Sequence, residues 1–387
     1  MASGKPRGPT GCHAIDRSRL GAVWQGGNMT DRKWILLPAA SILALVVAWG
    51  RSPSGAPALL LGVFLAAAVL AAVAHAEVLA HRFGEPFGSL ILAVAVTVIE
   101  VGLIVTLTVG GGDGSHSLAR DTVFAAVMIA TNGIVGASLL AATLRGRVAV
   151  FNAEGTGAML ATLSAVAVLS LVLPNFTASS PGPTFSVGQL VFAAVASISL
   201  YILFVFVQTV RHREQFEPVE GQPSPVPAGD ERPDGRATLT SFVLLLVALV
   251  AVVGLAKVIS PALESAVVDT GLPITFVGVL IALMVLMPEG ITAVRSAHAD
   301  NDDVQRSFNL AYGSAMASIG LTIPVIAVTS ILFDNTLLLG LSPANSLLLA
   351  LTIAVSVLTV TPGRATLLQA GVHLTVFAAF LTLSVLP

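Results

Sequence analysis

Residues 91–109, ILAVAVTVIEVGLIVTLTV, and residues 276–294, FVGVLIALMVLMPEGITAV, are two apolar runs that each carry one glutamate, Glu100 or Glu289. Runs of about 20 apolar residues are long enough to cross a bilayer as a helix. An ionised side chain near the centre of such a helix costs roughly 2.5–3.5 kcal/mol on insertion scales. We therefore expect these two carboxylates to mark a path for ions or protons rather than to serve a structural role.

The composition of the whole chain is that of an integral membrane protein. Its 387 residues are 55% hydrophobic and 10% charged, whereas soluble domains are about one quarter charged. It has no basic stripe with interleaved aromatic residues, so a lipid bilayer is expected as its surroundings and nucleic acid is not expected as a partner. The single cysteine, Cys12, allows no internal disulfide and lacks metal-ligand spacing.

Apolar runs of membrane-spanning length recur along the chain. Their continuity favours α-helices over the alternating pattern of an outer-membrane barrel. Eleven spans are predicted, at about 34–50, 57–80, 86–110, 119–143, 156–174, 187–210, 239–258, 272–297, 304–332, 343–361 and 366–386.

The distribution of Lys and Arg predicts the orientation of these spans. If the N-terminus is cytoplasmic, only Arg51, Arg120 and Lys257 of the 19 basic residues lie outside, and 16 lie inside. This bias agrees with the positive-inside rule, and one missed span would scramble it. An odd number of spans then places the C-terminus outside.

Two polar stretches flank or divide the apolar part. Residues 1–33 are predicted to form a disordered tail, with translation from Met29 as the alternative explanation. Residues 211–238 are rich in Pro, Gly and acids, which is typical of a flexible cytoplasmic linker.

The linker separates two similar halves, a first five-helix unit at 57–210 and a second at 239–387, after a leading helix at 34–50. GSLILAVAVTVIEVG, which begins at Gly88, matches GVLIALMVLMPEG, which begins at Gly278, in its apolar run, its acid and its following glycine. Glu100 lies in the third predicted span and Glu289 in the eighth, an odd offset of five, so equivalent helices must cross the membrane in opposite directions. Inverted repeats with a site at their interface are common in secondary transporters.

HAEVLAHRFGEPFGSLILAVAVTVIEVGLI, which begins at His75, and LMPEGITAV, which begins at Leu286, resemble the two signature regions of calcium/proton antiporters of the calcium/cation antiporter superfamily. The resemblance covers residues 34–387. It implies an all-α integral membrane protein with about eleven transmembrane helices, one leading helix and two inverted five-helix repeats, as in the sodium/calcium exchanger-like fold. It further implies calcium/proton antiport across a bacterial inner (plasma) membrane, without a cofactor or enzymatic activity.

One departure from the family pattern concerns ion selectivity. Many relatives have Gly-Asn shortly before the acid, whereas this chain has Val96-Thr97 and Leu286-Met287. Loss of amide coordination there favours a bacterial branch with broader cargo, calcium with sodium or potassium as further ions.

The chemistry of calcium suits the paired acids. Calcium takes 6–8 oxygen ligands, so Glu100 and Glu289 would supply charge, with neutral oxygens from nearby helices. The candidates for these oxygens are Thr97, Thr131, Asn132, Asn309, Ser314 and Ser318. The alternative is that the serines only pack between helices, which we favour for Ser314 or Ser318 taken alone.

The same carboxylates predict proton coupling. Desolvation and a like-charged neighbour both favour protonation, so the empty pair is expected to hold a proton that calcium expels. A relay toward the cytoplasm is expected from Glu77, with Glu85 and His75 as further members. For the histidine, an interfacial polar role is the favoured alternative, and His373 in the last span is interpreted as a hydrogen-bonded polar residue rather than a ligand.

Three other functions remain to be weighed against proton-coupled antiport. A sodium-coupled calcium exchanger would use the same acids, and a cation channel would need a continuous pore. The GGGD stretch at 110–113 superficially matches intramembrane aspartyl proteases, but no second intramembrane aspartate accompanies it. The sequence leaves stoichiometry, transport direction and oligomeric state open.

Overall fold

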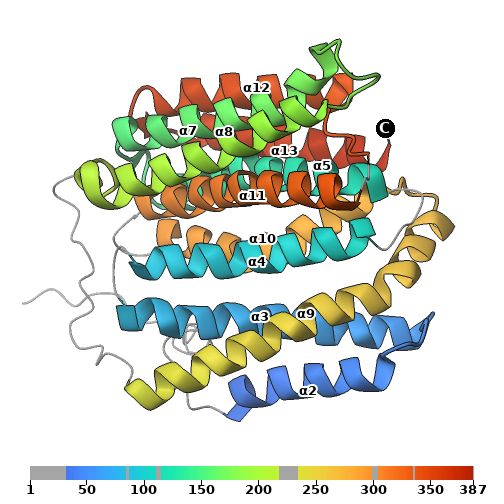
Figure 1. Cartoon of the computed structure of the whole chain (residues 1–387). Coiled ribbons are helices and arrows are strands. Elements are labelled where there is room, and N and C mark those ends of the chain that lie inside the picture. The colour runs from blue at the N-terminus through green and yellow to red at the C-terminus, as the bar shows by residue number, and fades with distance from the viewer. Residues whose placement is uncertain are drawn as a thin grey trace, which may run out of the picture.

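The computed structural model describes residues 32–83, 87–109, 115–217, 234–298, 304–333 and 336–386. Residues 1–31 of the predicted N-terminal tail, the centre of the linker, Glu85 and the GGGD stretch lie outside these ranges, and residues 32–33 of the tail belong to the first described helix. The described helices lie side by side, with α2, α3 and α9 on one side of the molecule and α7, α8 and α12 on the other (Figure 1). Helices α4, α10 and α11 lie between these two groups.

The first half of the chain contains helices joined by short π and 3₁₀ segments. Their bounds are α2 (Arg32–Ala48), α3 (Ala56–Phe83), α4 (Phe87–Val109), α5 (Ser115–Met128), the π segment η1 (Ile129–Ile134), α6 (Val135–Arg145), α7 (Ala153–Ala167), η2 (Val168–Val172), η3 (Leu173–Phe176), α8 (Val187–Phe206), η4 (Val207–Arg211) and η5 (Arg213–Phe216).

The described part of the second half is built from α-helices without π or 3₁₀ segments between them. They are α9 (Gly235–Asp269), α10 (Phe276–His298), α11 (Val304–Phe333), α12 (Pro343–Val360) and α13 (Leu367–Val385). The only strands among the described residues are β1 (Ala149–Val150) and β2 (Arg364–Ala365), which pair antiparallel.

All eleven predicted spans fall on helical segments. In the described part of the chain, nine helices are long and apolar enough to cross a membrane. Two shorter apolar helices, Trp34–Ala48 and Val94–Thr106, fall within α2 and α4. The predicted class, an all-α membrane protein, is therefore confirmed.

Two predicted boundaries differ from the structure. Helix α9 continues to Asp269, beyond the predicted end at 258, because the chain passes Lys257 and Pro261 without leaving the helix. The predicted linker at 211–238 is shorter, since η5 precedes it and α9 begins at Gly235. Phe216 ends η5 with a buried side chain, which fixes this segment to the helices.

Polar side chains define several helix starts. Asn152 accepts hydrogen bonds from the backbone N–H groups of Glu154 and Gly155 at the start of α7. Ser342 caps α12, which has Pro343 in its first turn. Ser/Thr-x-x-Gln capping boxes begin α8 and α13. These caps satisfy donors that have no partner within the helix.

The buried apolar side chains form two separate clusters. One cluster joins α2, α3 and α9 to one face of α4 and α10. The other cluster contains side chains of α5, α6, α7, α8, α11, α12 and α13. These pack against the opposite face of α10 and against Ile104 of α4. Helices α4 and α10 thus form the seam between two packed bodies.

Candidate functional site

Both intramembrane glutamates are buried where α4 and α10 meet. Glu100 is 3% exposed and Glu289 is 8% exposed. The two helices contact each other, and the carboxyl groups are close enough to interact electrostatically. The structure therefore brings together two acids that lie far apart in the sequence.

Glu100 and Glu289 lie at the boundary between the two apolar clusters. Ile99 and Leu103 flank Glu100 and pack in the cluster of α2, α3 and α9. Leu286 and Ala293 flank Glu289 and pack in the other cluster. The carboxylates therefore lie between two apolar bodies, with little access to water.

Helix α11 supplies a hydroxyl group to this site. The Ser318 hydroxyl donates a hydrogen bond to Oε1 of Glu100. Ser314 lies four residues earlier, on the same face of α11, and is half-buried. Helix α11 contacts both α4 and α10, so it closes a three-helix site around the acids.

Glu289 has an unpaired oxygen. Its Oε2 atom is buried and has no hydrogen-bond partner within the described residues. Buried polar atoms in folded proteins nearly always have a partner, and exceptions are typical of functional positions. This oxygen can accept a cation contact or carry a proton.

Backbone oxygens add to the ligands available on α10. Pro288 lies inside the helix, directly before Glu289, and has no N–H group. The carbonyl of Met284 therefore lacks its normal helical donor, one turn before the acid. On α4, Thr97 lies one turn before Glu100 and is buried, which places its hydroxyl on the same face.

Thr131 and Asn132 lie on the π segment η1, which contacts both α10 and α11. Both side chains take part in a buried network with α12 and α13. The Asn132 amide donates to the hydroxyls of Thr131 at 3.2 Å and Thr352 at 3.0 Å. These two predicted ligands are thus near the site helices. The Thr131 hydroxyl donates to the carbonyl of Val127, and Asn132 also contacts Met128 and His373.

Asn309 lies away from the acids. Its amide donates to the carbonyl of Phe216 at 2.6 Å, and its oxygen accepts from Gln305 at 2.9 Å. Nine residues of helix separate Asn309 from Ser318, a rise of about 13 Å. The structure places this predicted ligand near the N-terminus of α11, where it binds the last residue of η5.

Glu77 and His75 on α3 have different surroundings. Glu77 is half-buried and interacts electrostatically with Glu289. A ring nitrogen of His75 lies 3.1 Å from the carbonyl oxygen of Trp34, which joins α3 to α2. His75 is buried, and this contact joins two helices. Its proposed place in a relay stays a prediction. Glu85 falls outside the described residues.

Three buried hydroxyl side chains of α12 were not among the predicted site residues. Thr352, Ser356 and Thr359 recur at spacings of four and three residues and are all buried. This spacing puts them on one helix face, so a polar stripe was present in the sequence as a signal. It went unnoticed because Ser and Thr are ordinary residues in membrane helices.

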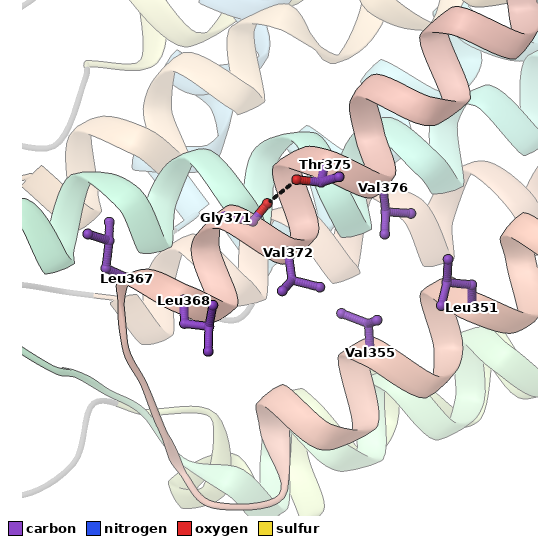
Figure 2. A pocket seen from close by; sticks show the side chains of 8 residues that line it. All are labelled: Leu351, Val355, Leu367, Leu368, Gly371, Val372, Thr375 and Val376. Atoms are coloured by element: carbon purple, nitrogen blue, oxygen red, sulfur yellow. Dashed lines mark hydrogen bonds between the residues drawn. The ribbon is translucent and has the colours of Figure 1, made fainter.

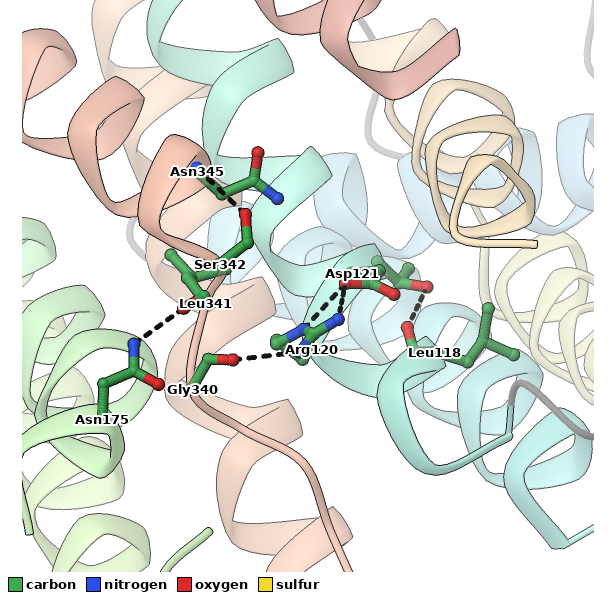
Figure 3. A network of polar contacts seen from close by, with 9 residues as sticks. Leu118, Arg120, Asp121, Asn175, Gly340, Leu341, Ser342 and Asn345 are labelled. Carbon is green, nitrogen blue, oxygen red and sulfur yellow. Dashed lines mark hydrogen bonds and ion pairs between the residues drawn. The ribbon is translucent and has the colours of Figure 1, made fainter. Parts of the chain in front are cut away.

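A second polar network lies at the start of α5 (Figure 3). Arg120 pairs with Asp121 at 2.8 Å and donates to the carbonyl of Gly340 at 2.9 Å. Asn175 donates to the neighbouring carbonyl of Leu341 at 2.7 Å. These bonds fasten the segment before α12 to α5 and η3.

Comparisons with known proteins give consistent results. The family described as "Sodium/calcium exchanger protein" matches residues 56–210 and 240–386. A putative ionic transporter, y4hA, from Sinorhizobium fredii is 46% identical over 352 residues, covering 91% of each chain. The sodium-potassium/proton antiporter ChaA from Escherichia coli is 33% identical over 357 residues, covering 88% of this chain and 93% of its own.

Two solved structures share the fold. Native YfkE, elsewhere described as a Ca²⁺/H⁺ antiporter protein, matches with a TM-score of 0.65 and 17% identity, over 92% of this chain and 100% of its own. The H⁺/Ca²⁺ exchanger CAX matches with a TM-score of 0.64 and 15% identity, over 91% of this chain and 89% of its own. At these identities the likeness concerns the fold.

Proposed function

Because the chain belongs to the sodium/calcium exchanger protein family, we propose that it exchanges calcium for protons across the bacterial inner membrane. Members of this family are transporters and not enzymes. Sodium and potassium are proposed as further cargo. The observation that carries this proposal is the buried pair of Glu100 and Glu289, with one oxygen of Glu289 unpaired.

The chemistry of the pair couples the two ions. Two neighbouring carboxylates in an apolar membrane interior are stable only when protons or a cation neutralise them. A divalent cation matches the charge of both, and its binding expels the proton. Ser318, Thr97 and the backbone carbonyl of Met284 are proposed to supply neutral oxygens that complete the coordination.

The seam between the two apolar clusters supports alternating access. Movement of one body against the other would open the pair to one side of the membrane at a time, and the neutralised site would cross most readily. The two matched segments, 56–210 and 240–386, coincide with the proposed halves and support an inverted repeat.

The names of the relatives favour protons over sodium as the coupling ion. ChaA is named a sodium-potassium/proton antiporter, and YfkE and CAX are named for calcium and protons. The family name leaves sodium-coupled calcium exchange as the second candidate.

Everted membrane vesicles test the proposal. With an imposed pH gradient in sodium-free vesicles, addition of a calcium or potassium salt is expected to release protons, which a pH-sensitive dye follows. A separate assay with an added sodium salt tests sodium as cargo. Calcium uptake that ignores the pH gradient and requires a sodium gradient would instead establish the sodium-coupled exchanger.

The central acids give the matched variants. Glu100→Gln and Glu289→Gln are expected to abolish cation-dependent proton movement while the protein still inserts, because each removes a charge that must bind the cation and the proton.

Glu77→Gln is expected to slow exchange and alter its pH profile but to retain equilibrium calcium binding, as a relay would. Normal exchange in either central variant refutes the site, and loss of binding in Glu77→Gln would make Glu77 a primary ligand.

A further inference from the structure

The last helix carries a fully buried imidazole that the proposed transport chemistry does not use. His373 lies on α13 and has no exposed surface. Its Nδ1 atom lies 3.2 Å from Oδ1 of Asn132, and its Nε2 atom lies 3.1 Å from the hydroxyl of Thr359. Both ring nitrogens therefore have a partner, as the sequence interpretation expected.

The direction of the hydrogen bonds follows from the Asn132 amide. Its nitrogen donates to the hydroxyls of Thr131 and Thr352, so its oxygen is the acceptor toward His373. Nδ1 then carries the proton, and Nε2 of the neutral ring accepts from the Thr359 hydroxyl. The ring also interacts with the backbone carbonyl of Thr131.

The side-chain amide of Asn132 has two N–H groups, and both have hydrogen-bond acceptors. Its Oδ1 atom accepts from His373 with one lone pair and retains the other. His373 therefore fixes the orientation of the Asn132 amide on η1, with the amide oxygen toward the imidazole. Without the imidazole, the amide could rotate and present its nitrogen instead.

The segment that His373 holds is next to one of the central acids. A β-carbon on Gly290, the residue after Glu289, would lie 3.4 Å from the side chain of Ile134 in η1. Segment η1 also contacts α11, which carries Ser318. A π segment within a helix is frequently found at functional sites, where it changes the positions of backbone and side-chain oxygens.

We propose that His373 is a positioning residue for cation binding, which acts through Asn132 to fix the orientation of η1 beside Glu289. This inference rests on the proposed cation transport. Outer-shell hydrogen bonds of this kind change metal affinity by about 10–100-fold when they are removed. The expected effect is therefore on the KM for the cation rather than on the maximal rate.

Two isosteric substitutions separate the two faces of the imidazole. In His373→Asn, the amide nitrogen occupies the place of Nδ1 and retains the donor to Asn132. In His373→Gln, the amide reaches the place of Nε2, which retains the contact with Thr359 but leaves Asn132 without its donor. We expect a KM within about threefold of the unchanged protein for His373→Asn and about tenfold higher for His373→Gln.

Thr375→Val is the matched control on the same helix. Thr375 faces the opposite side, where Val372 and Leu368 of α13 and Val355 of α12 line an apolar groove, and it donates only to the carbonyl of Gly371 (Figure 2). Its removal should leave KM unchanged. Thr359→Val removes the far partner of the ring and should change KM by less than His373→Gln does.

The results distinguish failure of the positioning role of His373 from failure of the proposed cation/proton exchange. KM does not depend on the amount of inserted protein, so partial misfolding does not mask the comparison. Equal KM values for His373→Asn and His373→Gln overturn the positioning role, and if His373→Gln fails to insert, a tenfold rise in His373→Asn overturns it alone. Absence of cation-dependent proton movement in the unchanged protein is instead a failure of the proposed function, and calcium binding to the purified variants then tests His373.

Discussion

Ser318 is the side chain through which α11 reaches the central carboxylates, and Ser314 provides its natural comparison. Both serines lie on one face of α11, but only Ser318 donates a hydrogen bond to Glu100. A hydrogen bond to a charged group contributes about 1.5–3 kcal/mol, and each 1.4 kcal/mol is about a tenfold change in binding.

We therefore expect Ser318→Ala to raise the KM for calcium by about tenfold. Ser314→Ala is expected to remain within about twofold, because no contact with the acids is lost. Calcium-dependent proton release in vesicles measures both values. Similar effects of the two substitutions would show that Ser318 only fills space between helices.

At this scale, the sequence identified the acids but not their partners. A glutamate in an apolar run is conspicuous because its burial is costly, so Glu100 and Glu289 could be singled out without a structure. Asn309 was predicted as a ligand because it lies on the helix after Glu289, but its position along α11 brings it to Phe216 instead. The network of Thr352, Thr359 and His373 depends on how three helices pack, which local sequence does not specify.

At the level of helices, the close approach of α5 and α10 depends on a glycine. A β-carbon on Gly278 would lie 2.9 Å from the backbone nitrogen of Thr122 and 3.0 Å from the carbonyl carbon of Asp121. Backbone atoms cannot yield as a flexible side chain would. Small residues at such crossings are typical of packing between membrane helices.

Gly278→Ala is expected to separate α5 from α10 and to destabilise the protein by about 1–3 kcal/mol. Gly313→Ala is the control, because it lies inside α11 with no atom within 4 Å of its β-carbon, and it should be neutral or slightly stabilising. Thermal unfolding in detergent, followed by size-exclusion chromatography, distinguishes them. If both variants melt at the same temperature, the crossing is looser than the structure indicates.

Helix positions were largely predictable, but their interruptions were not. Long apolar runs identify spans because the bilayer sets their length. The π segment η1 and the pairing of β1 with β2 arise from contacts between distant parts of the chain. The pairing of Ala149 with Ala365 joins segments more than 200 residues apart, beyond the reach of any local pattern.

On the scale of the whole molecule, helices of the two proposed halves pack against each other. Helix α3 packs on α9, α5 on α10, α6 on α13 and α8 on α11. The halves therefore share both apolar clusters and do not form separate bodies. The two predicted halves therefore follow one another in the sequence, but their helices are intermixed in space.

The orientation proposed from the basic residues has a direct test. Alkaline phosphatase fused after Leu386 is expected to be active and green fluorescent protein at that position dark, because the C-terminus is placed outside. Fusions after Glu217, at the end of the first half, should give the opposite result. Fluorescence from the C-terminal fusion would mean an inverted orientation or an even number of spans.

The hydrogen bond between Ser318 and Glu100 joins residues 218 positions apart in the chain. A ribosome adding about 5–20 residues per second needs roughly 10–40 s to make the distance between them. During that interval the nascent chain carries Glu100 without Ser318, and in the earlier part of it also without Glu289 and the apolar cover of α9. The insertion machinery must therefore retain the unfinished first half, or keep its glutamate protonated, until the second half is synthesised.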